Sequence, residues 1–375
     1  MNRKIIPPGK TIGILGGGQL GRMMALSARH MGYRIAVLDP TENSPCAQVA
    51  DVSVVAAYDD LEGAKELSRH ADVLTYEFEN IHKDTAKWLE DHFYLPQGAR
   101  LLAISQHRLR EKENIEKHGL PVAPYRAIHS LQDLEQAVRE LGLPSVLKTC
   151  RGGYDGKGQA VICEEHEIGA AYETLKNSGE LILEKWILFE KELSVIVSRS
   201  VSGEVATFPV AENIHRNNIL HQSIVPARID GKIQQKAREM AVQLAKGLNM
   251  VGTLAVEMFL TKDGDIFINE IAPRPHNSGH YTMEACETSQ FEQHVRAICG
   301  LPLGKTTLLK PVVMVNILGE HLDKVLAKLD QFDTAKLHLY GKKEAKTGRK
   351  MGHLNVLADS VEEALEKIKQ FGIWE

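Results

Sequence analysis

The chain has 375 residues, a length that predicts two or three domains. Hydrophobic residues make up 43% and charged residues 25%, which is typical of a globular protein. The formal net charge is −4, from 45 basic and 49 acidic residues, and this balance argues against a nucleic-acid-binding surface, which needs a basic stripe.

The first hundred residues alternate short apolar runs with helical patterns. We predict strands at Thr11–Leu15, Arg34–Leu38 and Asp72–Tyr76, and a helix over Leu20–Met31 that ends at Gly32. This rhythm predicts an α/β unit with a doubly wound parallel sheet.

A charged helical pattern then runs from Ser105, as its capping residue, to His118 before Gly119, and we place a domain boundary at its start. The segment from Pro144 to Ile271 is strand-rich, with one strong amphipathic helix over 233–248, which predicts an α+β domain. Its expected strands are Ser145–Lys148, Gln159–Cys163, Leu181–Glu184, Leu193–Val197, Val205–Val210, Thr253–Leu260 and Ile266–Ile271.

A third, smaller unit follows Leu301, with strands expected at Val312–Leu318 and His353–Leu357 and a last helix over Val361–Phe371. The predicted domains are therefore 1–104, 105–300 and 301–375.

The first glycine loop, Gly16–Gly21, fits G-x-G-x-x-G between a strand and a helix, and Asp39 ends the next strand. Taken alone, this pattern is typical of dinucleotide binding, with an acid for a ribose hydroxyl. A close-packed turn without a ligand, or a helix start that binds another anion or polar substrate, fits equally. The rest of the chain favours the last of these.

A second glycine loop, residues 148–159, contains four glycines and three cations between two expected strands. Such a loop is a flap and not the strand-to-helix turn of a Walker motif. Glycines let backbone amides close over phosphates, and Lys148 enters from the strand as a point charge. An exposed mobile hairpin is the alternative, but the charge density favours phosphate binding.

Two acids are expected to face each other across a hairpin. Lys262–Asp265 is a turn signal, and a turn centred on Asp263 and Gly264 pairs residues whose numbers sum to 527. Glu257 and Glu270 then stand opposite each other and repel unless a cation lies between them. Carboxylate oxygens suit Mg²⁺ that also holds nucleotide phosphates. A slipped register, or two solvent-facing acids, would remove the site.

These features together resemble the ATP-grasp superfamily. The resemblance narrows to the N5-carboxyaminoimidazole ribonucleotide synthetase family, and it covers essentially the whole chain. Three segments carry it: Arg151–Gln159, Asn269–His280 and Gly348–His353. It implies a three-domain ATP-grasp architecture: an N-terminal Rossmann-like domain, a central ATP-grasp domain and a small C-terminal β-rich domain.

The resemblance also implies an ATP-dependent carbon–nitrogen ligase of de novo purine (IMP) synthesis. ATP would phosphorylate bicarbonate to carboxyphosphate, and the amine of 5-aminoimidazole ribonucleotide would be carboxylated to N5-carboxyaminoimidazole ribonucleotide. This route is physically reasonable, because bicarbonate is inert until its oxygen becomes a leaving group. The protein would mainly position the reactants and neutralise charge.

Site residues follow from the resemblance position by position. ATP contacts are implied at Arg108, Lys148, Gly153, Tyr154, Asp155, Gly156, Lys157, Gly158, Gln159, Glu184, Lys185, Trp186, Ile187, Glu192, His215, Asn269 and Glu270. Substrate contacts are implied at Gln19, Leu20, Glu79, Lys342, Arg349 and Lys350, catalytic positions at Tyr154, Asp155, Arg274 and His276, and Mg²⁺ ligands at Glu257 and Glu270. Taken singly, His215, His276, Trp186 or the Arg349–Lys350 pair would be ordinary; their contexts single them out.

One position departs from the wider superfamily, because Ala272 stands where many ATP-grasp enzymes have an asparagine. The narrower family shares this alanine, so it supports the assignment, but it leaves open how a second Mg²⁺ is completed. Rival functions are a formate-dependent glycinamide ribonucleotide transformylase, another ATP-grasp ligase, a NAD-dependent dehydrogenase and a noncatalytic nucleotide-binding module. The run from Arg274 to His280 disfavours the transformylase, and neither a dehydrogenase nor a noncatalytic module accounts for the intact acid pair.

The expected location is cytoplasmic. No apolar stretch approaches the roughly 18 residues of a spanning helix. Residues 1–10 lack the apolar run of a signal peptide, and the five cysteines form no CxxC pair. We expect small-molecule partners and neither nucleic acid nor a membrane; the family resemblance also implies a homodimer.

Overall fold

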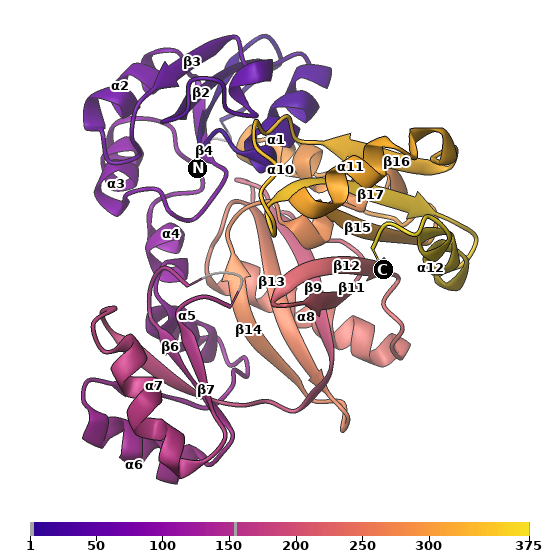
Figure 1. Cartoon of the computed structure of the whole chain (residues 1–375). Coiled ribbons are helices and arrows are strands. Elements are labelled where there is room, and N and C mark those ends of the chain that lie inside the picture. The colour runs from indigo at the N-terminus through magenta and orange to yellow at the C-terminus, as the bar shows by residue number, and fades with distance from the viewer. Residues whose placement is uncertain (1–3, 154–155, 375) are drawn as a thin grey trace.

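The computed structural model describes residues 4–153 and 156–374. Their strands form three sheets: a four-stranded N-terminal sheet, a second four-stranded sheet and a nine-stranded sheet. Figure 1 shows the N-terminal unit at the top and the second small sheet at lower left, and the large sheet extends from the centre to the C-terminal strands at the right. None of the described helices is long and apolar enough to cross a membrane.

The N-terminal sheet is parallel, in the order β3-β2-β1-β4, as the sequence predicted. Its unit comprises β1 (Thr11–Leu15), α1 (Gln19–His30), β2 (Arg34–Asp39), η1 (Ala47–Val49), β3 (Val52–Val55), α2 (Leu61–Arg69), β4 (Val73–Tyr76) and α3 (Lys83–His92). Side chains of β2 alternate between two cores: Ile35 and Val37 pack toward α1, and Leu38 packs toward α2 and α3. Helices therefore cover both faces, and the predicted doubly wound sheet is confirmed.

The span predicted as one helix from Ser105 to His118 contains the last residue of one helix and the whole of a second. Ser105 ends α4 (Arg100–Ser105) instead of capping the next helix, and α5 (Arg108–Lys117) begins after an extended His107 (φ −145°, ψ 107°). The helix is interrupted there because the His107 side chain hydrogen-bonds Glu180 and the Arg108 amide donates to the Cys150 carbonyl. These tertiary partners leave no local sequence pattern.

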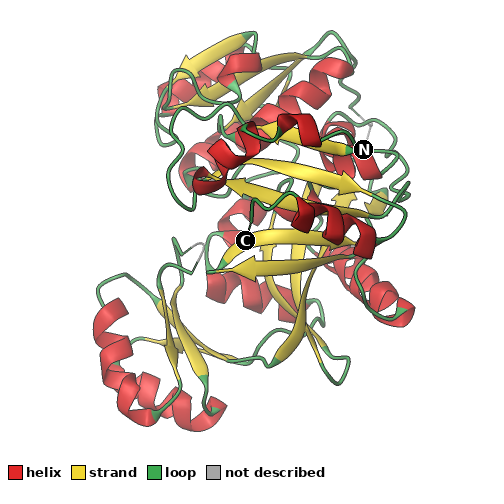
Figure 2. Cartoon of the chain, turned by 45° about the vertical axis from the view of Figure 1, so that its right-hand side comes forward, coloured by secondary structure: helices red, strands yellow, loops and turns green. Residues whose placement is uncertain are grey.

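The second small sheet is antiparallel, in the order β5-β8-β6-β7. Its elements are β5 (Tyr125–Ile128), α6 (Leu131–Leu141), β6 (Ser145–Thr149), β7 (Gln159–Ile162), η2 (Glu165–Glu167), α7 (Ile168–Leu175) and β8 (Leu181–Lys185). The sequence prediction lacked α7, which buries Ile168, Ala171 and Leu175 on this sheet. Both helices cover the outer face of the sheet, and its other side faces the large sheet (Figure 2).

The large sheet runs β14-β13-β9-β11-β12-β15-β17-β16, with β10 paired to β9. Its strands are β9 (Phe189–Arg199), β10 (Val205–Thr207), β11 (Ala211–Arg216), β12 (Ile219–Val225), β13 (Gly252–Thr261), β14 (Ile266–Ala272), β15 (Val312–Leu318), β16 (Ala335–Leu339) and β17 (Lys350–Leu357). The accompanying helices are α8 (Gly231–Gly247), η3 (Asn277–Gly279), α9 (Thr282–Ala285), α10 (Gln290–Ile298), η4 (Gly319–His321), α11 (Leu322–Leu326), η5 (Leu329–Gln331) and α12 (Val361–Gln370). The C-terminal strands continue the sheet through the β12–β15 pairing, so the C-terminal unit shares a backbone ladder with the central one.

Candidate active site

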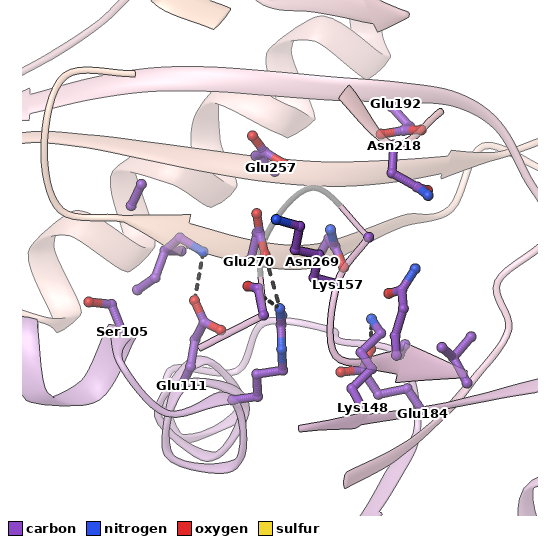
Figure 3. Close-up of a pocket in the computed structure, with 18 of the residues that line it drawn as sticks. Ser105, Glu111, Lys148, Lys157, Glu184, Glu192, Asn218, Glu257, Asn269 and Glu270 are labelled. Carbon is purple, nitrogen blue, oxygen red and sulfur yellow. Dashed lines mark hydrogen bonds and ion pairs between the residues drawn. The ribbon is translucent and has the colours of Figure 1, made fainter. Parts of the chain in front are cut away.

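A cavity of about 640 Å³ lies between the second small sheet and the large sheet. Predicted site residues from distant parts of the chain line it: Glu79, Arg108, Lys148, Gly153, Gly156, Lys157, Gln159, Glu184, Lys185, Trp186, Ile187, Glu192, His215, Asn269, Glu257, Glu270, Arg274, His276 and Lys350. In Figure 3, Glu257 and Glu270 project from neighbouring strands, and Lys148 and Glu184 lie on the small sheet below them.

Seven predicted residues remain. Tyr154 and Asp155 are outside the described residues. Gly158 is in the β6–β7 hairpin, where its φ of 67° and its proximity to the Thr149 hydroxyl both require glycine. Four predicted substrate residues do not line the cavity: Gln19, Leu20, Lys342 and Arg349.

Glu257 and Glu270 face each other as predicted, although the turn is centred differently from the prediction. Near the turn the strands pair with numbers summing to 526, for example Phe259 with Phe267, so the hairpin centres on Asp263 alone. A β-bulge then shifts the register by one residue and brings Glu257 opposite Glu270. The predicted facing is therefore confirmed, but the predicted register is wrong between the bulge and the turn.

Burial and the Glu270 charge raise the pKa of Glu257 to about 8. A carboxyl group in this position favours the protonated form unless a cation compensates its charge. Among the described residues no group of three or more His, Cys, Asp or Glu could hold a metal ion by itself. The pair fits a Mg²⁺ ion whose other ligands are phosphate oxygens and water, which is the usual arrangement for this ion.

Two residues at the start of α5 contact β14, one by an ion pair and one by a hydrogen bond. The Arg108 guanidinium lies 3.4 Å from Glu270 Oε2 and donates to the Gly153 carbonyl at 3.2 Å. Glu111 is 3% exposed and accepts from the Ile271 amide at 2.7 Å. Burial and the Glu270 charge raise the pKa of Glu111 to about 8. The sequence analysis missed Glu111, because its spacing from Arg108 is that of any exposed helical pair.

A buried charge cluster lies where α5 meets the second small sheet. Glu184 Oε2 is 3.0 Å from Lys148 Nζ and 3.3 Å from Lys112 Nζ. Burial alone would raise the pKa of Glu184, but the two ammonium groups outweigh it and hold this pKa at about 2. One carboxylate thus balances two cations, and the cluster keeps a positive charge that suits a polyphosphate. Lys112 was not predicted.

The predicted adenine hinge, residues 184–187, lies at the end of β8. Trp186 is 37% exposed, so it is not a core residue, and its amide donates to the Pro144 carbonyl at 3.1 Å. Phe189 and Phe259, which the sequence analysis also missed, stack at the cavity wall with ring centroids 4.7 Å apart. A flat apolar wall beside the end of β8 suits a purine base.

Two histidines reach the cavity in different charge environments. His215 Nδ1 is 2.8 Å from Glu192 Oε2; burial lowers its pKa, but Glu192 outweighs burial and the net shift is upward. Burial, Arg274 and Lys350 lower the pKa of His276 well below its usual value. This shift favours the neutral form of the His276 imidazole.

The hydrogen bonds of His276 define its tautomer. Nδ1 accepts from the Ser278 amide at 3.3 Å, so Nε2 carries the proton and faces Glu257 Oε1 at 3.2 Å.

Arg274 joins the large sheet to the N-terminal unit. Its guanidinium contacts both carboxylate oxygens of Glu79, at 2.5 and 3.0 Å. Burial would raise the pKa of Glu79, but Arg274 holds it below its usual value. Such a two-point pair fixes orientation as well as charge.

The first glycine loop is internally satisfied. Glu77 accepts from the amides of Gly18 and Gly21 at 2.5 and 2.6 Å, and Asp39 accepts from Gly17 at 2.7 Å and from the Tyr58 hydroxyl at 2.6 Å. A dinucleotide would need these same amides and this same acid. The fingerprint interpretation therefore fails on geometry.

A cationic cluster follows β16. The Lys342 ammonium donates to the Lys350 carbonyl at 2.7 Å, and the Arg349 guanidinium donates to the Glu344 carbonyl at 3.0 Å. Burial lowers the pKa of Lys342 to about 8, with Arg349 and Lys350 adding to the effect and Glu77 opposing it. Arg349 and Lys350 disfavour the charge of Lys342, and a bound dianion would offset this effect.

Family models match three successive parts of the chain. A ribonucleotide synthetase preATP-grasp domain matches residues 9–106, an ATP-grasp domain matches residues 113–291, and a phosphoribosylaminoimidazole carboxylase C-terminal domain matches residues 312–367. The three matches follow the chain order expected for an ATP-grasp enzyme.

Individual relatives agree with these matches. The N5-carboxyaminoimidazole ribonucleotide synthase of Bacillus subtilis (strain 168) is 58% identical over 98% of this chain and 97% of its own. A crystal structure of the ADP complex of N5-carboxyaminoimidazole ribonucleotide synthetase superposes with a TM-score of 0.97 at 64% identity, covering 100% of this chain and 99% of the other.

A more distant structure, from Aspergillus clavatus, is 34% identical with a TM-score of 0.90 and covers 96% of this chain and 97% of the other. It is the N5-carboxyaminoimidazole synthase in complex with ADP and 5-aminoimidazole ribonucleotide. The chain belongs to the N5-carboxyaminoimidazole ribonucleotide synthase family of ATP-grasp enzymes.

Proposed function

We propose that this chain catalyses the Mg²⁺- and ATP-dependent carboxylation of 5-aminoimidazole ribonucleotide by bicarbonate. The products are N5-carboxyaminoimidazole ribonucleotide, ADP and phosphate, and the route is carboxyphosphate, in de novo purine (IMP) biosynthesis. One observation carries the proposal above all. The Glu257–Glu270 pair, the glycine flap and the Arg274–His276 segment border a single cavity.

The nucleotide occupies the space between the two sheets. Lys148 and Arg108 face its phosphates, while the flap backbone, including Gly153 and residues 156–159, closes over them. The hinge residues 184–187 read the base, and Glu192 with His215 holds the ribose. Glu257 and Glu270 would hold Mg²⁺, with Asn269 beside them, and the ion supplies charge neutralisation at the phosphates.

Bicarbonate lies beyond the terminal phosphate, next to Arg274 and His276. The guanidinium balances the growing negative charge, and the neutral imidazole offers a hydrogen bond through Nε2 without adding a proton to the nucleophile. Because both side chains are already anchored, by Glu79 and by Ser278, they need little reorganisation during the reaction.

The ribonucleotide lies on the side of the cavity where the N-terminal unit meets the C-terminal unit. Lys342, Arg349 and Lys350 hold its phosphate, and Glu79 and the start of α1 hold its polar groups. The Leu20 side chain is buried in the N-terminal core, so this position offers its backbone. Gln19 precedes it at the helix start. We assign Asp155, together with Tyr154, to orienting and deprotonating the attacking amine.

Two further statements belong to the proposal. The family relation supports a homodimer. The five cysteines, which are all free thiols, support a cytoplasmic location. Neither is needed for the chemistry above, because every residue assigned to the reaction comes from one chain.

Substrate-dependent release of phosphate tests the proposal. Phosphate should form with Mg-ATP when 5-aminoimidazole ribonucleotide and bicarbonate are both present, and formate with glycinamide ribonucleotide should not replace them. Release with the formate pair alone would assign the chain to the transformylase class instead.

A further inference from the structure

Gln290, the first residue of α10, is fully buried, and its side-chain amide faces the main chain of His276. Its Oε1 accepts from the His276 amide at 2.9 Å, and its Nε2 donates to the His276 carbonyl at 2.8 Å. The same Nε2 lies 3.2 Å from His280 Nδ1. One side chain thus forms a two-bond ring with the backbone of a site residue, much as a neighbouring strand would.

This ring acts where the chain leaves β14. His276 has an extended backbone (φ −130°, ψ 155°) just before the turn of η3. With its backbone in this position, the imidazole Nε2 faces Glu257 at 3.2 Å. The Gly279 amide also donates to the His276 carbonyl, at 3.0 Å, but the described residues give the His276 amide no other acceptor.

The surroundings leave space for the Gln290 amide. A Cβ atom on Gly279 would lie only 2.4 Å from Gln290 Oε1, so glycine is required for the ring to form. Thr282 Oγ1 accepts from the Gln290 backbone amide at 2.9 Å and donates to the Gly279 carbonyl at 2.6 Å. The turn and the helix start are therefore built around this glutamine.

We propose that Gln290 is a positioning residue for the carboxylation, which fixes the His276 backbone so that the imidazole faces Glu257 and the reacting oxyanion. This inference rests on the proposed function. Gln290 touches no substrate itself, because it does not line the cavity. Its effect passes through the main chain of His276, and losing it misplaces the imidazole without removing it.

The same helix supplies a matched control. Gln293 is also fully buried, and it forms the same kind of ring with Gly304: Nε2 donates to the carbonyl and Oε1 accepts from the amide, both at 2.8 Å. Neither Gln293 nor Gly304 lines the cavity. A substitution at Gln293 therefore removes equivalent bonds from the same helix at a place with no part in the reaction.

The first test compares Gln290→Met with Gln293→Met in steady-state carboxylation, after wild-type activity has been established. Both variants should lower the unfolding temperature by similar amounts. Only Gln290→Met should lower kcat, by roughly 10- to 100-fold as expected for a small misplacement of a reacting group. The KM for ATP should change little. Equal kcat losses in both variants, or a normal kcat in Gln290→Met, would overturn the inference.

A second test uses pH and does not require the first variant to fold. In Gln290→Glu a protonated carboxyl keeps one acceptor and one donor, as in the amide, whereas the ionised form has no donor for the His276 carbonyl. The kcat of Gln290→Glu relative to wild type should therefore recover as pH falls, and that of Gln293→Glu should stay level. A ratio independent of pH for Gln290→Glu contradicts the inference. A wild type that does not carboxylate the ribonucleotide refutes the proposed function instead.

Discussion

The proposed Mg²⁺ ligands Glu257 and Glu270 destabilise the folded protein while no cation lies between them. The β13–β14 ladder holds the two carboxylates opposite each other, and burial adds to their repulsion. The proposed Mg²⁺ ion would relieve both effects, so its binding would recover the free energy that the facing carboxylates cost.

Glu270→Gln keeps the size of the side chain and removes the charge that faces both Arg108 and the proposed ion. We expect an intact fold and a kcat lower by at least about 10- to 100-fold, measured as phosphate release over a Mg²⁺ series. Asp263→Asn, an exposed change in the same hairpin turn, is the control and should behave as wild type. Near-normal activity and Mg²⁺ dependence in Glu270→Gln would refute the metal assignment.

The pKa of Glu257 predicts a pH dependence of stability. Its folded pKa of about 8 lies above its ordinary value of 4.5, so the folded protein holds this proton more tightly than the unfolded chain. Without Mg²⁺ the free energy of unfolding should therefore fall as pH rises from about 4.5 to about 8. Chemical denaturation of wild type and Glu257→Gln checks this. The variant should show a shallower slope, since Glu111 still contributes, and identical slopes would contradict the assignment.

Sequence patterns could predict residues whose partners are near in the chain. The facing of Glu257 and Glu270 follows from one hairpin, even though a bulge corrects its register. Glu111 could not be found in this way, because the Ile271 amide that it binds is 160 residues away. Lys112 likewise resembles any exposed helical lysine until Glu184 is placed beside it.

At the scale of elements, glycine lets the described part of the β6–β7 flap come close to the β11–β12 turn. Gly156 has a φ of 80°, and a Cβ there would lie 2.4 Å from the Asn218 amide nitrogen of the β11–β12 turn. This contact joins the flap to the opposite wall of the cavity.

Gly156→Ala should therefore keep the flap away from Asn218 and raise the KM for ATP severalfold, with only the fall in unfolding temperature that backbone strain causes. Gly179→Ala is the matched control: its φ of 95° imposes the same type of backbone strain, roughly 1–2 kcal/mol, but no atom lies within 4 Å of the added carbon. Parallel ATP titrations of both variants test this. Equal KM changes would mean that strain alone is responsible.

At the two ends of the chain, the sequence predicted seven elements within three residues, because their apolar periodicity is clean: β1, α1, β2, β4, β15, β17 and α12. It did not predict β3, α2, α3, β16 or α11. The missed strands β11 and β12 are different. They bury polar residues, including Glu212, Asn213 and Ser223, in the middle of the large sheet. Such residues weaken the apolar signal of a strand, so sequence reasoning fails where the fold buries polar groups inside a sheet.

The whole molecule brings a nucleotide cavity, an N-terminal unit and a C-terminal cation cluster together. The Arg274–Glu79 pair links the large sheet to the N-terminal unit, and the burial of Lys342 near Glu77 links the C-terminal unit to it. Sequence alone could propose each part, but only the continuous β12–β15 ladder places the cation cluster beside the cavity.

Arg349→Ala tests this placement. It should raise the KM for 5-aminoimidazole ribonucleotide by about tenfold or more, the usual cost of a lost hydrogen bond to a charged group, and leave the KM for ATP nearly unchanged. Lys346→Ala removes a cation from the same loop, but this side chain is 71% exposed and pairs with Glu344. It should alter neither constant. Equal weakening of both substrates by Arg349→Ala would move the cluster to the nucleotide site.

The central claim is that ATP cleavage drives carbon from bicarbonate onto the ribonucleotide amine. The most direct measurement follows labelled bicarbonate with 5-aminoimidazole ribonucleotide and Mg-ATP, trapping the labile carbamate as it forms. We predict that label enters the acceptor in step with ADP, without NAD or NADP. Rapid ATP cleavage with no label in the acceptor, or hydride transfer to NAD, would contradict the account.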